Sequence, residues 1–166
     1  RGYKAGGFNL SATVTGDPDI KPEYVDSYEV GMKANIGSTF HANIAAFSYD
    51  YRNSQTLLFQ RNPVTNIIES LSVSIEKAVS RGLEIETQWR PIDPLTIIAN
   101  YSYRDAHIDR HCCALDPLNI PAGLQQLAGN DLIDAPRNKV ALAATYRFDF
   151  DPGSLNVTLN YNWRDE

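Results

Sequence analysis

Two histidines and two cysteines lie close together over residues 107–113, at His107, His111, Cys112 and Cys113. Both residue types are common metal ligands, and histidines four residues apart share one face of a helix. The surrounding sequence has no helical pattern of apolar residues, and adjacent cysteines do not have the spacing of a zinc site. We therefore expect loop histidines that do not hold a metal.

Cys112 and Cys113 are the two cysteines of the chain, and they are adjacent. Three states are open to them: a disulfide with each other, a bridge to a part of the protein outside this sequence, or free thiols. A disulfide needs an oxidising compartment, which an outer loop of an exported protein would provide. We favour the vicinal disulfide between Cys112 and Cys113.

Glu84 and Glu86 are two carboxylates separated by one residue, and glycosidases use carboxylates in pairs. In an extended strand both side chains would lie on the same polar face and line a wet surface, which requires no catalytic role. The sequence has no G-x-S-x-G nucleophile motif, no phosphate-binding loop and no clustered His, Asp and Glu set. We predict that the chain is not an enzyme and carries no cofactor.

The composition favours β-strands over helices. The 166 residues carry a net charge of −5 and include nine Tyr, six Phe and two Trp, and aromatic residues are enriched in strands. A mildly acidic chain without a basic stripe is not expected to bind nucleic acid. No apolar run approaches the roughly 20 residues of a membrane helix, which excludes a helical span but leaves open a membrane β-barrel with alternating strands.

A sequence period of two is clearest over residues 24–36. The even positions from Tyr28 to Ile36 are apolar and the odd positions from Ser27 to Asn35 are mostly polar, as in a strand with one apolar and one wet face. The fold class is therefore all-β, an antiparallel up-and-down meander of about seven strands. The strands are predicted at 1–9, 24–36, 40–52, 77–90, 95–106, 137–149 and 155–165.

The first turn is predicted from the register of the strands around it. A three-residue turn at 37–39 pairs Ile36 with Phe40 and keeps apolar side chains on one face, whereas a two-residue turn would mix the faces. Unless a bulge intervenes, the same register moves an aromatic run to the polar face: Phe47, Tyr49 and Tyr51.

The predicted connections alternate in length. Short turns at 37–39, 91–94 and 149–154 alternate with long loops at 53–76 and 107–136. The first long loop contains two short strand-like pieces, at 56–59 and 66–72, which are candidates for extensions of the flanking strands beyond a membrane. This layout is typical of an outer-membrane barrel, with short periplasmic turns and long outer loops. Aromatic residues gather near the strand ends, as at a membrane interface: Trp89, Tyr101, Tyr103, Tyr146, Phe148, Tyr161 and Trp163.

Two other interpretations remain open at this point. A passive porin-like barrel has the same strand pattern, and a soluble β-sandwich binding module also alternates because any half-buried sheet does. The membrane interpretation requires that the apolar faces do not pack into a closed dry core beneath a second layer. Four residues represent these faces: Val30, Ile85, Leu142 and Leu159.

Four segments resemble the C-terminal part of the barrel of TonB-dependent outer-membrane receptors. The most specific is KPEYVDSYEVGMK at residues 21–33, which resembles the "PE…SYE.G.K" strand of that family. The others are the glycine-rich RGYKAGGFN at 1–9, AVSRGLEIE at 78–86 with its "GxE" pattern, and GNDLIDAP at 129–136. The four segments follow the family's order over most of the chain.

The resemblance implies a barrel of about 22 strands with a plugged lumen in the bacterial outer membrane, of which this chain forms a part. It implies energy-coupled import of a scarce nutrient, with a ferric siderophore as the expected ligand. The expected partners are outer-membrane lipid and the TonB complex, contacted through an N-terminal region that this sequence does not include. We therefore expect a fragment of a longer receptor.

The resemblance also implies that the outer loops at 53–76 and 107–136 face the ligand. Cationic and aromatic side chains suit anionic or aromatic ferric chelates. On this basis we expect ligand contacts from six residues: Arg61, Tyr103, Arg104, His107, Arg110 and His111.

Overall fold

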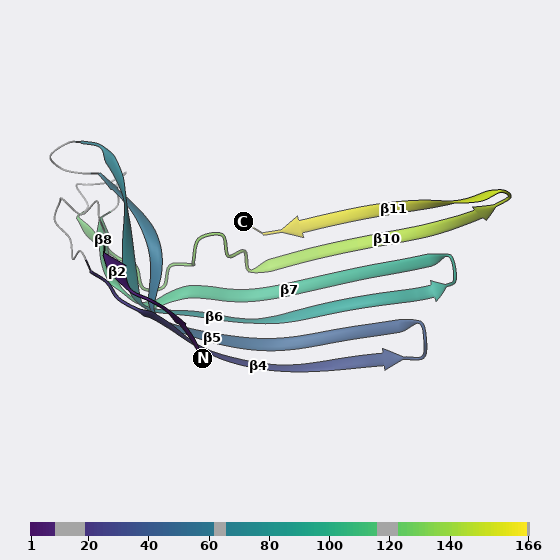
Figure 1. The fold of residues 1–166 in the computed structure, drawn as a ribbon, viewed down its shortest axis with the longest axis horizontal. Coiled ribbons are helices and arrows are strands. Elements are labelled where there is room, and N and C mark those ends of the chain that lie inside the picture. The colour runs from purple at the N-terminus through teal and green to yellow at the C-terminus, as the bar shows by residue number, and fades with distance from the viewer. Residues whose placement is uncertain (9–18, 62–65, 116–122, 166) are drawn as a thin grey trace. The chain divides into compact units, whose positions relative to one another are not determined.

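The structure is a computed structural model that describes residues 1–8, 19–61, 66–115 and 123–165 (Figure 1). These residues form strands and contain no helix that could span a membrane. The strands are β1 (Gly2–Lys4), β2 (Gly7–Phe8), β3 (Asp19–Ile20), β4 (Glu23–Ile36), β5 (Phe40–Arg61), β6 (Ile68–Ile92), β7 (Leu95–Arg110), β8 (Cys112–Leu115), β9 (Leu124–Gln126), β10 (Asn138–Phe150) and β11 (Gly153–Arg164).

Seven of these strands form one sheet in the order β1-β4-β5-β6-β7-β10-β11, while β2 pairs with β3 and β8 with β9. The predicted all-β antiparallel meander is confirmed. The chain divides into two compact units. Unit 1 comprises Arg1–Ser27, Tyr49–Ser80 and Ala106–Ile133, and unit 2 comprises Tyr28–Ser48, Arg81–Asp105 and Asp134–Glu166.

Short turns close the three hairpins of unit 2 (Figure 1). They lie at 37–39, 93–94 and 151–152. The first turn has three residues, so the predicted turn length is confirmed. It begins with Gly37 at a φ of +61°, a left-handed conformation that glycine adopts without the steric penalty of a Cβ.

The register of β10 keeps like side chains together across its neighbours. Leu142 pairs with Tyr161 of β11 and with Ala99 of β7, so apolar side chains form one row. On the other face Thr145 pairs with Thr158, and their hydroxyl oxygens are 2.9 Å apart in a hydrogen bond. Side chains that the period of two assigns to the same face are therefore neighbours across these strands in the observed register.

The ring of Phe47 covers Gly82 in unit 2. A Cβ built on Gly82 would lie 2.6 Å from Cζ of Phe47 and would also meet the carbonyl oxygen of Tyr103. Gly82 lies two residues before Glu84 and four before Glu86 along β6, so it is on the same polar face as these carboxylates. The ring of Phe47 therefore lies on the polar face of the sheet. This is the face that the three-residue turn predicted for Phe47.

Most of the segment predicted as a loop at 53–76 is strand in unit 1. The two strand-like pieces at 56–59 and 66–72 lie largely within extensions of the flanking strands. β5 continues to Arg61 and β6 already begins at Ile68. The predicted strands 40–52 and 77–90 are therefore too short at this end. Two facing segments can extend their backbone pairing beyond an apolar band, since a ladder of hydrogen bonds does not require apolar side chains.

The predicted loop at 107–136 is also partly strand. β7 continues to Arg110, past the predicted end at residue 106, and the short strands β8 and β9 pair within the segment. The predicted first strand at 1–9 is divided into β1, which pairs with β4, and β2, which pairs with β3. Asn9, its last predicted residue, lies outside the described part of the chain.

Unit 1 has a small apolar core of its own. Ile75, Ala78 and Ile108 form a buried cluster. Four partly buried apolar residues pack against it: Tyr51, Val73, Leu127 and Leu132. The cluster joins β5, β6 and β7 to the segment after β9, which explains why these polar extensions are ordered as strands rather than as loops.

Candidate functional site

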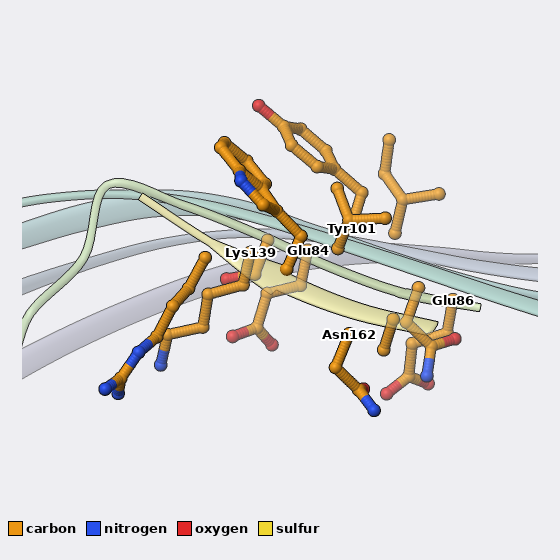
Figure 2. A pocket seen from close by; sticks show the side chains of 12 residues that line it. Glu84, Glu86, Tyr101, Lys139 and Asn162 are labelled. Carbon is orange, nitrogen blue, oxygen red and sulfur yellow. The ribbon is translucent and has the colours of Figure 1, made fainter. Parts of the chain in front are cut away.

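The polar face of unit 2 carries charges of both signs. An open hollow of about 620 Å³ is lined by residues of β6, β7, β10 and β11, and acidic, basic and amide side chains are among them. Figure 2 shows Glu84, Glu86, Lys139 and Asn162 on one side of the strands and Tyr101 on the other side. This division is the alternation of a strand with one wet and one apolar face.

A second hollow, of about 380 Å³, lies on the polar face over β4, β5 and β6. Its charged rim includes Glu29, Lys33 and Glu86, and the amide of Asn43 donates a hydrogen bond to Glu86 Oε2 at 3.3 Å. Its floor includes Gly31, where a Cβ would lie 3.2 Å from the carbonyl oxygen of Ile44. The two hollows share Glu84 and Glu86, so these carboxylates line a continuous wet wall.

The opposite face of unit 2 is apolar and exposed. Val30 is 72% exposed, Leu142 is 42% exposed and Leu159 is 73% exposed, while Ile85 is partly exposed. Every buried apolar side chain in the described part of the chain belongs to unit 1. No second layer of described residues covers these four side chains in a closed dry core. The structure is therefore consistent with the membrane-barrel interpretation. The face is available to acyl chains.

Aromatic rings lie toward both ends of β10 on this apolar face. At one end Val140 pairs with Tyr101 on one side and with Trp163 on the other. The Tyr101 hydroxyl donates a hydrogen bond to Asn138 Oδ1 at 2.7 Å. At the turn end the rings of Tyr146 and Phe148 have centroids 4.5 Å apart. Such rings, with a polar tip and an apolar body, suit the two interfaces of a bilayer.

Three of the six expected ligand residues come from β5 and β7. Arg61 is the last residue of β5, and its side chain lies outside the described part of the chain. Tyr103 shares the apolar face with Tyr101, because the two residues are two positions apart along β7. Arg104 lies on the other face of β7, and its N–H donates to the carbonyl oxygen of Arg137 at 2.8 Å.

The other three expected ligand residues lie in unit 1. His107 forms a β-bridge with Asp131, and Arg110 is exposed at the end of β7. The carbonyl oxygen of His111 accepts a hydrogen bond from the N–H of Leu127, while the buried Nδ1 of His111 has no hydrogen-bond partner among the residues that the structure describes. Residues four apart on an extended chain lie about 13 Å apart, too far for two histidines to share one metal ion.

No metal cluster is formed by the residues that the structure describes. Among them no group of three or more His, Cys, Asp or Glu side chains could hold a metal ion. Cys112 and Cys113 form a disulfide with each other at the start of β8. Cys112 pairs with Gln126 of β9, and a bulge separates this pair from the next pair, at Ala114.

Two charged clusters of unit 1 were not found by reasoning from the sequence. One joins Arg1, Tyr24, Asp26 and Arg52. The other is the ion pair between Lys77 and Asp109, whose Nζ and Oδ2 atoms are 2.8 Å apart. Each cluster joins strands that are distant in sequence, so only the pairing of those strands brings its members together.

The Lys77 ammonium lowers the pKa of the Asp109 carboxyl below its ordinary value of 3.8, through a hydrogen bond and through its charge. Because the folded pKa is lowered, the pair stabilises the folded state above that ordinary value. The contribution disappears as the pH falls through the lowered folded pKa. Both side chains are about two-fifths exposed, so the contribution is small.

We expect Lys77→Gln to raise the pKa of Asp109 toward its ordinary value. The measurement is urea unfolding of the full-length protein from neutral pH down to about pH 3, the range over which an aspartate titrates. The stability difference between wild type and Lys77→Gln should shrink as the pH falls. Lys139→Gln, in unit 2, is the charge-matched control and should show no such convergence. A pH-independent difference for Lys77→Gln would contradict the pairing.

The comparison with protein families decides the identity of the chain. The model of the TonB dependent receptor-like beta-barrel family matches residues 1–166, the whole of the sequence. The chain belongs to this family. TonB-dependent receptors are β-barrels of the bacterial outer membrane, so the apolar face of unit 2 is its lipid-facing surface and the polar face lines the lumen.

Solved structures of receptors have the same fold as this TonB-dependent receptor segment. The ferric yersiniabactin uptake receptor FyuA from Yersinia pestis matches with a TM-score of 0.68 and 20% identity, over 97% of this chain and 22% of that chain. BauA, the ferric preacinetobactin receptor from Acinetobacter baumannii, matches with a TM-score of 0.62 and 18% identity, over 98% and 22%. The copper transporter OprC matches with a TM-score of 0.60 and 13% identity, over 88% and 20%.

The segment spans about a fifth of the length of each of these receptors. At such low sequence identity the likeness shows the fold alone. A search of curated proteins found no match to the chain. The predicted assignment to the TonB-dependent receptors is confirmed by the family model.

Proposed function

We propose that the receptor containing this segment imports a ferric siderophore across the outer membrane by energy-coupled, TonB-dependent transport. The family match over the whole chain is the observation that carries the proposal. The wet, charged face of unit 2 supports it, because a lumen wall of both charge signs lets polar solutes and polar protein segments lie against it.

The choice of a ferric siderophore has support from two of the structural relatives. FyuA and BauA are named for the ferric chelates yersiniabactin and preacinetobactin. OprC is named as a copper transporter, so copper is the second candidate substrate. In the described part of unit 1, Arg110 ends the long strand β7 and His111 follows it, and the two offer cationic or hydrogen-bonding groups to an anionic chelate.

We retain Arg110, His107 and His111 as ligand residues of unit 1 in this proposal. Arg61 and Arg104 are retained as two separate ligand contacts. Tyr103 leaves the set, because its place on the lipid-facing side turns it away from the lumen. The barrel itself provides binding and passage.

The test is uptake by a deletion strain that carries the full-length gene on a plasmid. Under iron limitation the gene should restore uptake of radiolabelled iron from one or more members of a siderophore panel. The same cells without TonB should lose that uptake, since the transport is energy-coupled. Uptake that persists without TonB would indicate a passive barrel. Accumulation of labelled copper with no siderophore response would indicate the copper function instead.

A further inference from the structure

The ribbon that β1 forms with β4 is interrupted within unit 1 and resumes as the pairing of β2 with β3. β1 ends at Lys4, which pairs with Glu23 of β4, and the next paired residue of the same segment is Gly7 in β2. Between these pairs lie residues 5–6 on one segment and 21–22 on the other, which belong to no strand. The break therefore joins two short ladders that lie in different sheets.

The residues of this break explain why the ladder does not run through it. Pro22 has no N–H and cannot donate to a partner strand. Gly6 lies so close to the opposite segment that a Cβ built on it would clash with the carbonyl oxygen of Ile20 and would lie 3.0 Å from the backbone nitrogen of Pro22. The two segments approach each other closely here, but regular strand pairs do not hold them together.

The Gln55 side chain of β5 supplies hydrogen bonds in place of the missing pairs. Its Nε2 donates to the carbonyl oxygen of Ala5 at 2.9 Å and to the carbonyl oxygen of Lys21 at 3.1 Å. A carboxamide has two N–H hydrogens, so it can satisfy one backbone carbonyl on each segment of the break. The backbone N–H of Gln55 donates to Glu23 Oε2 at 2.8 Å, which fixes Gln55 against the first residue of β4.

Two further side chains complete the hydrogen bonds at the break. Asn53 Nδ2 donates to the carbonyl oxygen of Pro22 at 3.2 Å, and the N–H of Lys21 donates to Ser74 Oγ of β6 at 3.0 Å. The side chains of Gln55, Asn53 and Ser74 are on half-buried residues. These backbone groups of the break are therefore satisfied by side chains of neighbouring strands rather than by each other.

A joint held by side chains opens more easily than a ladder. Release of the Gln55 carboxamide breaks two hydrogen bonds and leaves the strand pairs on both sides of the break intact. The side chain turns about its own single bonds, so its release needs no change in the backbone of β5. Local opening is therefore expected at the break before it occurs within either ladder.

We propose that residues 5–6 and 21–22 form a hinge about which β2 and β3 move together, and that the Gln55 carboxamide is the latch of this hinge. Hinges are usually a few residues at the ends of elements that absorb a change in backbone angles. When the latch is released, β2 and β3 change direction as one unit while β1 stays paired with β4. The inference does not depend on which nutrient the receptor imports.

The experiment measures distances between two spin labels in the full-length receptor in detergent, by double electron–electron resonance. One label is attached at Glu76→Cys on β6. The other is attached at Phe8→Cys beyond the break or at Lys4→Cys before it, and all three of these residues are exposed. Cys112 and Cys113 are joined in a disulfide, so within this segment a thiol-specific label reacts with the introduced cysteines.

Gln55→Met removes both donors of the latch and keeps a side chain of similar length. It should raise the population of a second Phe8–Glu76 distance about tenfold, the factor expected for two lost hydrogen bonds. The Lys4–Glu76 distance should remain as in the receptor with Gln55. If both distances broaden equally, Gln55 only supports the sheet and the hinge is refuted. If neither distance changes, Gln55 is not a latch.

Gly6→Ala tests the same hinge without a change at Gln55, because its Cβ would press against the backbone of Ile20. A folded Gly6→Ala receptor should also show the second Phe8 distance, and an unchanged distribution would overturn the hinge. Gln125→Met is the matched control, since it makes the same substitution at an exposed glutamine of β9 in unit 1. It should change neither distance, and an effect equal to that of Gln55→Met would refute the latch. The shift in gel mobility on heating reports whether each variant is folded.

Discussion

Leu159→Arg is expected to lower the unfolding free energy of the full-length barrel by about 2–4 kcal/mol, the cost of a cation on the lipid face near the bilayer midplane. Leu159 lies in the interior of β11, pairs with Ala144 and is 73% exposed on the apolar face. The arginine side chain would have to leave the hydrocarbon or draw water into it, and both responses cost free energy. The measurement is urea unfolding of the barrel in lipid vesicles.

Asn160→Arg provides the control at nearly the same depth. Asn160 is the next residue of β11, pairs with Ala143 and faces the lumen. The same side chain introduced there remains in a wet environment, so its cost should be well below 1 kcal/mol, as for an ordinary surface substitution. Equal costs for the two substitutions would mean that β11 does not separate lipid from water, and the assignment of the two faces would be wrong.

Gly82→Ala is expected to destabilise the folded barrel by about 1–3 kcal/mol, the usual cost of overpacking. A Cβ at this position would lie 2.6 Å from Cζ of Phe47 and would also meet the carbonyl oxygen of Tyr103. The ring of Phe47 can move, but the carbonyl belongs to the backbone of β7. The stability of the variant is measured by the same unfolding experiment.

Phe47→Ala separates the two contacts of Gly82. In the Phe47→Ala background the cost of Gly82→Ala should fall but should not vanish, because the clash with the backbone carbonyl remains. Gly31→Ala is a milder comparison, since its Cβ would lie 3.2 Å from the carbonyl oxygen of Ile44. A Gly82→Ala cost that is unchanged by removal of the ring would show that Phe47 does not pack there.

The strands of unit 2 were predictable because the two sides of each strand face different media. In β11 apolar and polar residues alternate, as Leu159 and Asn160 do, because one side of the strand faces lipid and the other faces water, and the observed register agrees with this alternation. The turn at 37–39 was predictable for the same reason, since only one turn length keeps Ile36 and Phe40 on the same face.

The strand-like pieces at 56–59 and 66–72 indicated extensions in unit 1, but the full length of these extensions was not predictable by the same reasoning. Beyond the apolar band both sides of a strand can be polar, so the sequence of β5 after residue 52 resembles that of a loop. The apolar residues that hold the extensions together, Ile75 and Ile108, come from strands far apart in sequence. The cluster around Asp26 likewise depends on the pairing of β1 with β4, which three residues of β1 determine.

The paired extension of β5 and β6 restricts how the outer part of the receptor can change in length during evolution. A single-residue deletion in one strand would reverse the direction of every side chain beyond it relative to its partner strand. Insertions and deletions near this ribbon should therefore be retained in even numbers and matched between the two strands. A loop of the same length would tolerate odd and unmatched changes equally well.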